Sequence, residues 1–187
     1  LGRLAGSEMC IRDSYKIRST VYSLGKSMPK RKIDTRTAIG FIGLGAMGIG
    51  MVKNLLNNNI AVSVFEINQE KKTELTALGA SFEKDPAAVA SKVTKLFLCL
   101  PFKPEVDSVL FNDKGVIAGS KSGLMVLDTS TLLSKDSVEI SQKLKKVGIS
   151  YNDAPISGLP YRAQNGSLTV LFGGSKKEFS SFTPYLN

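Results

Sequence analysis

A glycine-rich string could bind phosphate. Its six residues are Gly43, Leu44, Gly45, Ala46, Met47 and Gly48. In a G-x-G-x-x-G between a strand and a helix, the first glycine permits a tight turn and the second lets a pyrophosphate approach the backbone. The third lets the helix pack closely on the strand. The helix N-terminus then offers free N–H groups and the positive end of the helix dipole. The alternative is a tight strand–helix turn that holds no ligand.

Glu66 could complete such a site. It ends the next apolar run, 18 residues after Gly48, close to the ~20-residue spacing of the acid that binds the adenosine ribose. A carboxylate there accepts hydrogen bonds from the ribose hydroxyls and repels a 2′-phosphate, so we expect NAD as the cofactor. Lys71 and Lys72 leave NADP as an alternative. For Glu66 itself, the alternative is a solvated charge at a strand end.

Three further strings follow apolar runs, where ligands of open α/β sheets bind. Leu100-Pro101 ends one run, and the Asp-Thr-Ser-Thr string that begins at Asp128 ends another. For the Asp-Thr-Ser-Thr string, a turn that ends the strand and caps the next helix is as good an explanation as a ligand site. The Asp-Ala-Pro-Ile-Ser-Gly string that begins at Asp153 offers a hydroxyl beside flexible backbone N–H groups. Such a loop can hold a carboxylate, although turns without function look the same. Cys99 is interpreted as a small core residue.

Short apolar runs alternate with helical segments from residue 38 onward. Continuous hydrophobicity is typical of strands covered on both faces, so we expect strands at Ala38–Ile42, Ile60–Phe65, Leu96–Leu100, Leu124–Leu127 and Leu168–Phe172. Helices are expected from about Ala46 to Asn57, from Asn68 to Gly79, from near Pro104, and from Ser134 to Gly148. We expect Met47, Met51 and Leu55 of the first helix to face the sheet. The last helix should bury a stripe of Leu133, Ile140, Leu144 and Val147. This alternation predicts a doubly wound, mostly parallel α/β domain over residues 38–187.

Composition narrows the chemistry. The chain has no His, which excludes Ser-His-Asp and Cys-His nucleophiles and any His-ligated metal, and its two Cys are far apart. No metal site is expected. The net charge is +9, but residues 1–37 hold nine Lys/Arg and three Asp/Glu, so most of the excess lies outside the predicted domain. We therefore expect no nucleic-acid partner, and the longest uncharged run, residues 37–52, is too short to span a membrane.

Residues 1–37 show neither helical nor strand periodicity. We expect a disordered or non-native extension, since the string from Ser7 to Ser14 resembles a translated sequencing adapter. A basic, Ser-containing mitochondrial leader is the alternative, although Glu8, Asp13 and Asp34 are unusual for that class. A cytoplasmic location is expected, with the mitochondrial matrix as the alternative if this extension is native.

Taken in order, the strings resemble the 3-hydroxyisobutyrate dehydrogenase family of β-hydroxyacid dehydrogenases. That family shares its dinucleotide-binding domain with 6-phosphogluconate dehydrogenase. The matching strings begin at Gly40, Leu100, Asp128, Asp153 and Asn165, and they close at Gly173-Gly174. The resemblance covers essentially all of residues 38–187.

The resemblance implies a role for each matching position. The cofactor would be bound by Gly43, Leu44, Gly45, Ala46, Met47, Gly48, Glu66, Leu100, Pro101, Glu105 and Thr131, with Thr131 near the nicotinamide. Ser157, Gly158 and Leu159 would bind the substrate carboxylate. Leu159 and Arg162 stand where the family usually has glycines, which leaves the substrate open. Arg162 either pairs with an acidic substrate or is a solvated surface charge.

The family's general acid–base is a Lys beyond Gly173-Gly174, on a segment leading into an all-helical second domain. We therefore expect no catalytic residue within this chain. The resemblance implies hydride transfer between a nicotinamide cofactor and a small 3-hydroxy acid, in a full-length protein that is a homo-oligomer. The alternatives are a non-catalytic dinucleotide-binding or interaction module and a relative of the imine reductases.

Overall fold

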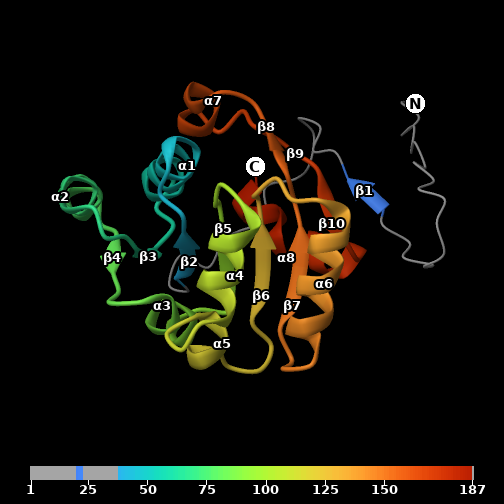
Figure 1. The fold of residues 1–187 in the computed structure, drawn as a ribbon. Coiled ribbons are helices and arrows are strands. Elements are labelled where there is room, and N and C mark those ends of the chain that lie inside the picture. Colours follow the sequence, from blue (N-terminus) through green and yellow to red (C-terminus); the bar gives the residue numbers. More distant parts are fainter. Residues whose placement is uncertain (1–19, 23–37, 187) are drawn as a thin grey trace, which may run out of the picture.

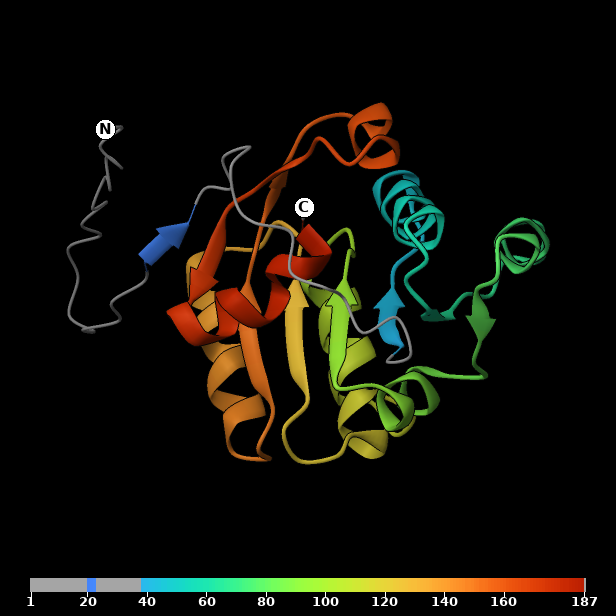
Figure 2. The same cartoon turned by 180° about the vertical axis from the view of Figure 1, so that it is seen from behind.

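The computed structural model describes residues 20–22 and 38–186, which form one large sheet with helices on both faces (Figures 1 and 2). The eight strands lie in the order β1-β10-β7-β6-β5-β2-β3-β4. Their bounds are β1 Thr20–Tyr22, β2 Ile39–Ile42, β3 Val62–Phe65, β4 Ser81–Phe82, β5 Lys95–Leu98, β6 Met125–Asp128, β7 Ser150–Asp153 and β10 Phe172–Gly174. A separate two-stranded ribbon pairs β8 (Ile156–Ser157) with β9 (Thr169–Val170).

The described residues also form eight helices, of which α8 follows the last strand. They are α1 Ala46–Asn57, α2 Gln69–Ala77, α3 Pro86–Lys92, α4 Lys103–Phe111, α5 Val116–Gly119, α6 Ser134–Lys145, α7 Pro160–Gln164 and α8 Lys176–Leu186. Side chains of α1, α2 and α8 pack on one face of the sheet, and side chains of α3 to α6 pack on the other. Both faces are covered, as the apolar runs predicted.

The six strands from β4 to β7 are mutually parallel. Strand β10 runs antiparallel to β7, and β1 pairs antiparallel with β10, so β10 is the one reversed strand among the eight described. The parallel part of the sheet starts at the central strand β2, continues outward through β3 and β4, and then returns to the other side of β2 at β5. This is the strand order of doubly wound dinucleotide-binding folds, and it confirms the predicted fold class. The order reverses between β2 and β5, so a crevice is expected above their carboxyl ends.

Capping fixes the helix that follows β3. The side chain of Asn68 accepts a hydrogen bond from the Lys71 N–H at 3.1 Å and begins α2, as predicted. Gly79 follows the helix at a φ of +94°, the left-handed conformation that ends many helices. The predicted bounds of α1 match the observed ones, and α4 begins one residue before Pro104.

The predicted strand Leu168–Phe172 is wrong as a single element. It is divided between β9 and β10, because Val170 pairs with β8 in the two-stranded ribbon whereas Phe172 pairs in the main sheet, and Leu171 between them is 44% exposed. The Leu171 N–H donates to the carbonyl of Pro155 instead of pairing in the main sheet. Since the segment between β7 and β10 packs no crossover helix against the sheet, the chain returns antiparallel.

Two predicted helical faces also need correction. In α6, Ile140 and Leu144 are buried, but Leu133 and Val147 lie at the helix ends and are 63% and 47% exposed. Leu133, not Ser134, is the N-cap residue, and among the described residues no side-chain hydrogen bond caps the start of this helix. In α1, Leu55 is buried and the half-buried Met51 packs against the same core, as predicted, but Met47 is half-buried and is not part of that core. The other buried residues of the helix are Gly48, Gly50 and Val52.

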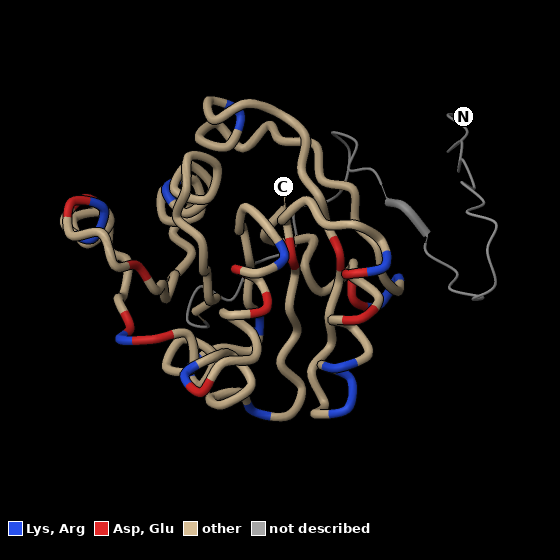
Figure 3. Tube along the Cα trace, viewed as in Figure 1, with Lys and Arg blue, Asp and Glu red and all other residues tan. Residues whose placement is uncertain are grey.

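One short strand comes from the N-terminal extension. Residues Thr20–Tyr22 form β1, which pairs antiparallel with β10, so strand structure occurs where none was expected. The predictions of disorder or non-native origin for residues 1–19 and 23–37 fall outside the described residues. Over the described part of the chain, no helix is long and apolar enough to cross a membrane. Acidic and basic residues are interspersed around the sheet and its helices (Figure 3).

Candidate functional site

The glycine-rich turn begins at the carboxyl end of the central strand β2. Gly43 has a φ of +102°, and a Cβ at this position would collide with the carbonyl group of Cys99, which follows β5. Gly48, in the first turn of α1, faces the carbonyl oxygen of Gly43, and a Cβ there would overlap that atom. A tight turn and a close helix–strand contact therefore require these two glycines.

Gly45 differs from both of its neighbouring glycines. Its φ is −67°, an ordinary value for any residue, and no described atom outside Gly45 and its two chain neighbours lies within 4 Å of the position that its Cβ would occupy. The reason for glycine here is therefore neither backbone strain nor a contact with the described residues. An open space lies directly above the turn, of the kind that a ligand approaching the backbone requires.

The N-terminus of α1 opens into the same space. Gly45 is the N-cap residue, no side chain of the described residues caps this helix, and its first turn holds no acidic residue. The backbone N–H groups of the first turn and the helix dipole both favour an anion. Leu44 is buried beneath the turn, Ala46 is exposed and Met47 is half-buried. A pyrophosphate fits this chemistry and this free space.

Glu66 lies at the end of β3, beside the glycine-rich turn. Its Oε1 accepts hydrogen bonds from the backbone N–H groups of Ile67, at 2.8 Å, and Asn68, at 2.9 Å. Its Oε2 lies 3.7 Å from Nζ of Lys71, and the Glu66 side chain is only 12% exposed. Glu66 is therefore a fixed carboxylate instead of a freely solvated one.

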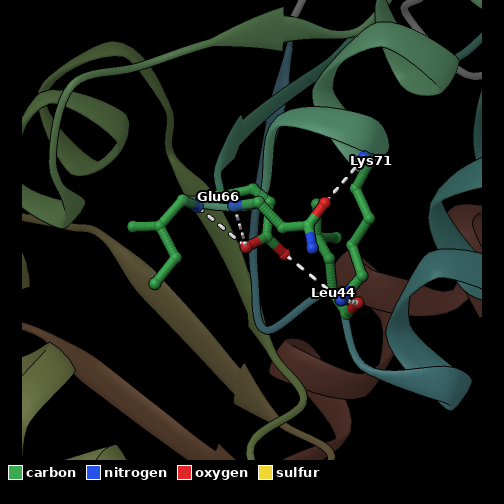
Figure 4. A network of polar contacts seen from close by, with 5 residues as sticks. Leu44, Glu66 and Lys71 are labelled. Atoms are coloured by element: carbon green, nitrogen blue, oxygen red, sulfur yellow. Dashed lines mark hydrogen bonds and ion pairs between the residues drawn. The ribbon is translucent and has the colours of Figure 1, made fainter.

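Lys71 links that carboxylate to the glycine-rich turn. Its Nζ donates a hydrogen bond to the carbonyl oxygen of Leu44 at 2.7 Å while facing Glu66 (Figure 4). The sequence analysis considered Lys71 only as a residue that leaves NADP as an alternative cofactor, and it did not predict this hydrogen bond. The spacing from Asn68, which places Lys71 in the first turn of α2, was the signal for this contact.

The other candidate cofactor residues lie at the carboxyl ends of β5 and β6. Leu100 is half-buried, and its N–H donates to the Ser130 hydroxyl oxygen at 2.9 Å. Pro101 is exposed, Glu105 is exposed in the first turn of α4, and Thr131 is exposed after β6. Since β3, β2, β5 and β6 are parallel neighbours, their carboxyl ends lie on the same side of the sheet, and these residues lie there together with the glycine-rich turn.

The candidate substrate residues belong to a separate excursion after β7. Ser157 is exposed in β8, Gly158 has a φ of +146°, and Leu159 is the 61% exposed N-cap residue of α7. Helix α7 packs against α1, where Gly50 faces Ala163 (Figures 1 and 2). The segment from β8 to β9 thereby packs against α1, the helix that follows the glycine-rich turn. Arg162 is exposed on α7.

Two acidic residues, Asp128 and Asp153, lie at the carboxyl ends of β6 and β7. Asp128, fully buried at the end of β6, accepts hydrogen bonds from the Ser130 N–H at 2.9 Å and from the Tyr151 hydroxyl at 2.7 Å. Burial raises the pKa of Asp128, and the hydrogen bonds from Ser130 and Tyr151 oppose that rise. Burial, and then the charge of Asp128, raise the pKa of Asp153 to about 6. The sequence left the string at Asp128 open between a ligand site and strand exit with helix capping, and it did not indicate the contact between Asp128 and Tyr151.

Cys99 lies between β5 and Leu100 and is partly buried. Burial raises the pKa of its thiol above the usual value, which keeps the thiol protonated at neutral pH. Its carbonyl group, not its sulfur, contacts the glycine-rich turn at Gly43. The interpretation of Cys99 as a small packing residue agrees with this position.

Known proteins resemble the chain in sequence. The mitochondrial 3-hydroxyisobutyrate dehydrogenase of Mus musculus is 31% identical over 151 residues, which are 81% of this chain and 45% of the mouse protein. The 2-(hydroxymethyl)glutarate dehydrogenase of Eubacterium barkeri is 33% identical over 149 residues, which are 80% of this chain and 50% of that protein. The chain thus spans about half the length of the curated relatives it matches.

Solved structures resemble it in fold. A crystal structure of 3-hydroxyisobutyrate dehydrogenase from Salmonella typhimurium superposes with a TM-score of 0.75 at 31% identity, covering 80% of this chain and 52% of that one. An imine reductase from Myxococcus stipitatus has a TM-score of 0.74 at 20% identity, covering 81% of this chain and 51% of that one, and this likeness shows the fold alone. Residues 38–187 also match the model of a domain family described as the NAD binding domain of 6-phosphogluconate dehydrogenase, and the chain belongs to that family.

Proposed function

We propose that this chain is the cofactor-binding part of an oxidoreductase that transfers a hydride between a nicotinamide dinucleotide and a small 3-hydroxy acid. The observation that carries the proposal is Gly45, which has an ordinary φ and open space where a Cβ would be. Glycine at such a position serves a ligand rather than the fold. The dehydrogenases of hydroxy acids that the chain resembles support the reaction class.

In this proposal the pyrophosphate binds over Gly45 and the first turn of α1, and Glu66 accepts hydrogen bonds from the adenosine ribose. Leu100, Pro101 and Glu105 lie along the cofactor, and Thr131 lies toward the nicotinamide. The bound cofactor supplies or accepts the hydride. The residues of this chain hold the cofactor in register with the substrate loop, Ser157 to Leu159.

Glu66 makes NAD the preferred cofactor. The carboxylate is fixed by two backbone N–H groups, so it cannot turn away from a 2′-phosphate at low cost. Lys71 offsets part of this repulsion, because its ammonium group lies 3.7 Å from the same carboxylate. The preference for NADH over NADPH therefore depends on how far the repulsion of the 2′-phosphate by Glu66 exceeds its attraction to Lys71.

Calorimetric titration of the 187-residue chain with NADH and NADPH tests the cofactor assignment. We expect tighter binding of NADH, and Glu66→Ala should narrow the preference by about tenfold or more, as loss of a hydrogen bond to a charged group predicts. Glu70→Ala is the matched control, since Glu70 is exposed in the same segment. Tighter binding of NADPH by the wild-type chain, or an equal effect of the two substitutions, would contradict the assignment.

The substrate loop and the assembly complete the proposal. Ser157 and the backbone around Gly158 bind the substrate carboxylate, with Leu159 beside it, and the whole protein is a homo-oligomer. A cytoplasmic location stays a prediction, with the mitochondrial matrix as the alternative. A non-catalytic binding module is distinguished from a dehydrogenase by assaying the whole protein with 3-hydroxyisobutyrate and other 3-hydroxy acids.

A further inference from the structure

Asp128 is unusual among the acidic residues described. It is fully buried at the end of β6, and none of the ion pairs found among the described residues includes it. A buried carboxylate without a cation destabilises a fold unless hydrogen bonds compensate for its lost hydration. Here the compensating donors are Ser130, two residues along the chain, and Tyr151 of β7. An apolar residue would fill this position at lower cost to the fold.

The hydrogen bonds extend from Asp128 toward the candidate cofactor site. The Ser130 backbone N–H donates to Oδ1 of Asp128, and the Ser130 hydroxyl oxygen accepts a hydrogen bond from the Leu100 N–H at 2.9 Å. Ser130 is itself buried, with 3% of its surface exposed. The carboxylate thus orients the serine, and the serine holds the backbone of the residue that follows β5.

Leu100 in turn contacts the glycine-rich turn. Its Cδ2 lies 3.0 Å from the position that a Cβ of Gly43 would occupy, and the carbonyl of Cys99 lies closer still. Contacts therefore lead from Tyr151 and Asp128 through Ser130 and Leu100 to the first glycine. They join β7, β6, β5 and β2 near the carboxyl ends of these strands, where the cofactor is proposed to bind.

We propose that Asp128 is a positioning residue of the cofactor site, acting through Ser130 to hold Leu100 against the glycine-rich turn. This inference rests on the proposed function, because it assigns Asp128 to a site that binds a nicotinamide dinucleotide. Asp128 itself touches neither the cofactor nor the substrate, since it is fully buried.

Thr129 provides a matched control for a purely structural role. It lies between Asp128 and Ser130, and its N–H and hydroxyl both donate to the carbonyl of Leu98, at 2.8 Å and 2.6 Å. This hydroxyl also joins β6 to β5, but it does not reach Leu100. Thr129→Val removes the buried hydroxyl that bonds the Leu98 carbonyl and the Cys99 thiol, with little change in volume.

The experiment measures NADH affinity by calorimetry and the free energy of unfolding by urea denaturation for each variant of the full chain. We expect Ser130→Ala to weaken NADH binding by about three- to tenfold, the range that loss of one hydrogen bond produces. Asp128→Ala should weaken binding at least as much, and Asp128→Asn should restore part of it, because the amide oxygen still accepts from the Ser130 N–H. Thr129→Val should lower stability and change NADH affinity by less than about twofold.

Three outcomes would overturn the inference. Equal NADH affinity of Ser130→Ala and the wild type would mean that the network supports only the fold, and this comparison remains valid if Asp128→Ala does not fold. Loss of affinity in Thr129→Val equal to that in Ser130→Ala would mean that affinity follows stability. A wild-type chain that binds neither NADH nor NADPH would refute the proposed function itself, and with it any cofactor role for Asp128.

Discussion

At the scale of single residues, Gly45 and Gly48 have different surroundings although they lie three positions apart. The Cβ position of Gly48 coincides with the carbonyl of Gly43, whereas that of Gly45 faces open space. The sequence pattern predicted both roles. Because the φ of Gly45 is −67°, its backbone would accept a β-branched residue, and under the proposed function only a bound ligand would disfavour one there.

Substituting the two glycines should therefore separate binding from folding. We expect Gly45→Val to abolish detectable NADH binding while lowering the melting temperature only slightly, because its methyl groups would occupy the pyrophosphate space. Gly48→Ala should instead destabilise the fold by roughly 1–3 kcal/mol, as overpacking in a close contact does. Calorimetry and thermal denaturation monitored by circular dichroism measure the two effects. Normal NADH binding by Gly45→Val would mean that the turn has only a structural role.

Asp153 should make stability depend on pH. Its pKa is raised from 3.8 to about 6 in the folded protein, so the folded state retains the proton more readily than the unfolded chain. That contribution to stability is present below the unfolded pKa and is lost as the pH rises through about 6. Between about pH 4 and pH 7, we expect Asp153→Asn to become progressively more stable relative to the wild type.

Urea denaturation across this pH range measures the difference, with Asp113→Asn as a control because Asp113 is exposed in the loop after α4. A wild-type-minus-variant difference that is flat with pH would show that Asp153 has an ordinary pKa.

At the scale of helices and strands, the sequence predicted most elements but not their contacts. Apolar runs and capping residues located β2, α1 and α2, because each depends on neighbours within a few positions. Helix α3 was missed, although Asp85 caps it by accepting from the Ala88 N–H at 2.7 Å and Pro86 opens it. The division of the last strand at Leu171 depends on Pro155, sixteen positions earlier, and no local pattern contains that pairing.

The contact between α1 and α7 is another such pairing, and it can be tested. A Cβ on Gly50 would lie 2.9 Å from Cβ of Ala163 and 3.1 Å from the backbone nitrogen of Gln164. We expect Gly50→Val to lower the free energy of unfolding by roughly 1–3 kcal/mol. Adding Ala163→Gly should recover part of that loss, because it removes the nearest obstructing atom.

A double-mutant cycle in urea measures the coupling, which should reach at least about 0.5 kcal/mol between directly touching residues. Additive effects of the two substitutions would mean that α7 does not pack on α1 at this point.

At the scale of the whole molecule, the strand order brings residues from distant parts of the sequence to one edge. The fold class followed from alternating strands and helices, since right-handed crossovers leave few topologies. The candidate site was predicted where it depends on motif spacing, as at Gly43, Gly45 and Gly48. It was not predicted where it depends on packing between strands, as in the contacts of Asp128 with Tyr151 and of Ser130 with Leu100.

The 187-residue chain by itself should bind NADH without oxidising a hydroxy acid. Removing the hydroxyl proton needs a positioned base, which typically contributes about 10²–10⁴-fold to the rate. The chain has no His, Lys71 donates to the Leu44 carbonyl, and Lys103 is paired with Asp107. Asp128 is buried away from any substrate. An absorbance assay with NAD and 3-hydroxyisobutyrate measures turnover, and sustained formation of NADH would mean that a base lies within these residues.

Because β2 is central in the sheet, binding of the proposed cofactor at its end should affect the stability of the whole fold. The turn after β2 packs against the Cys99 carbonyl on one side and accepts a hydrogen bond from Lys71 on the other, so its surroundings are complete only when both halves of the sheet have assembled around that strand. A ligand that binds only the folded chain raises the free energy of unfolding by RT ln(1 + [L]/Kd), about 2.7 kcal/mol when its concentration is 100 times Kd. The resistance of this chain to unfolding and to proteolysis would then follow the supply of nicotinamide dinucleotide around it.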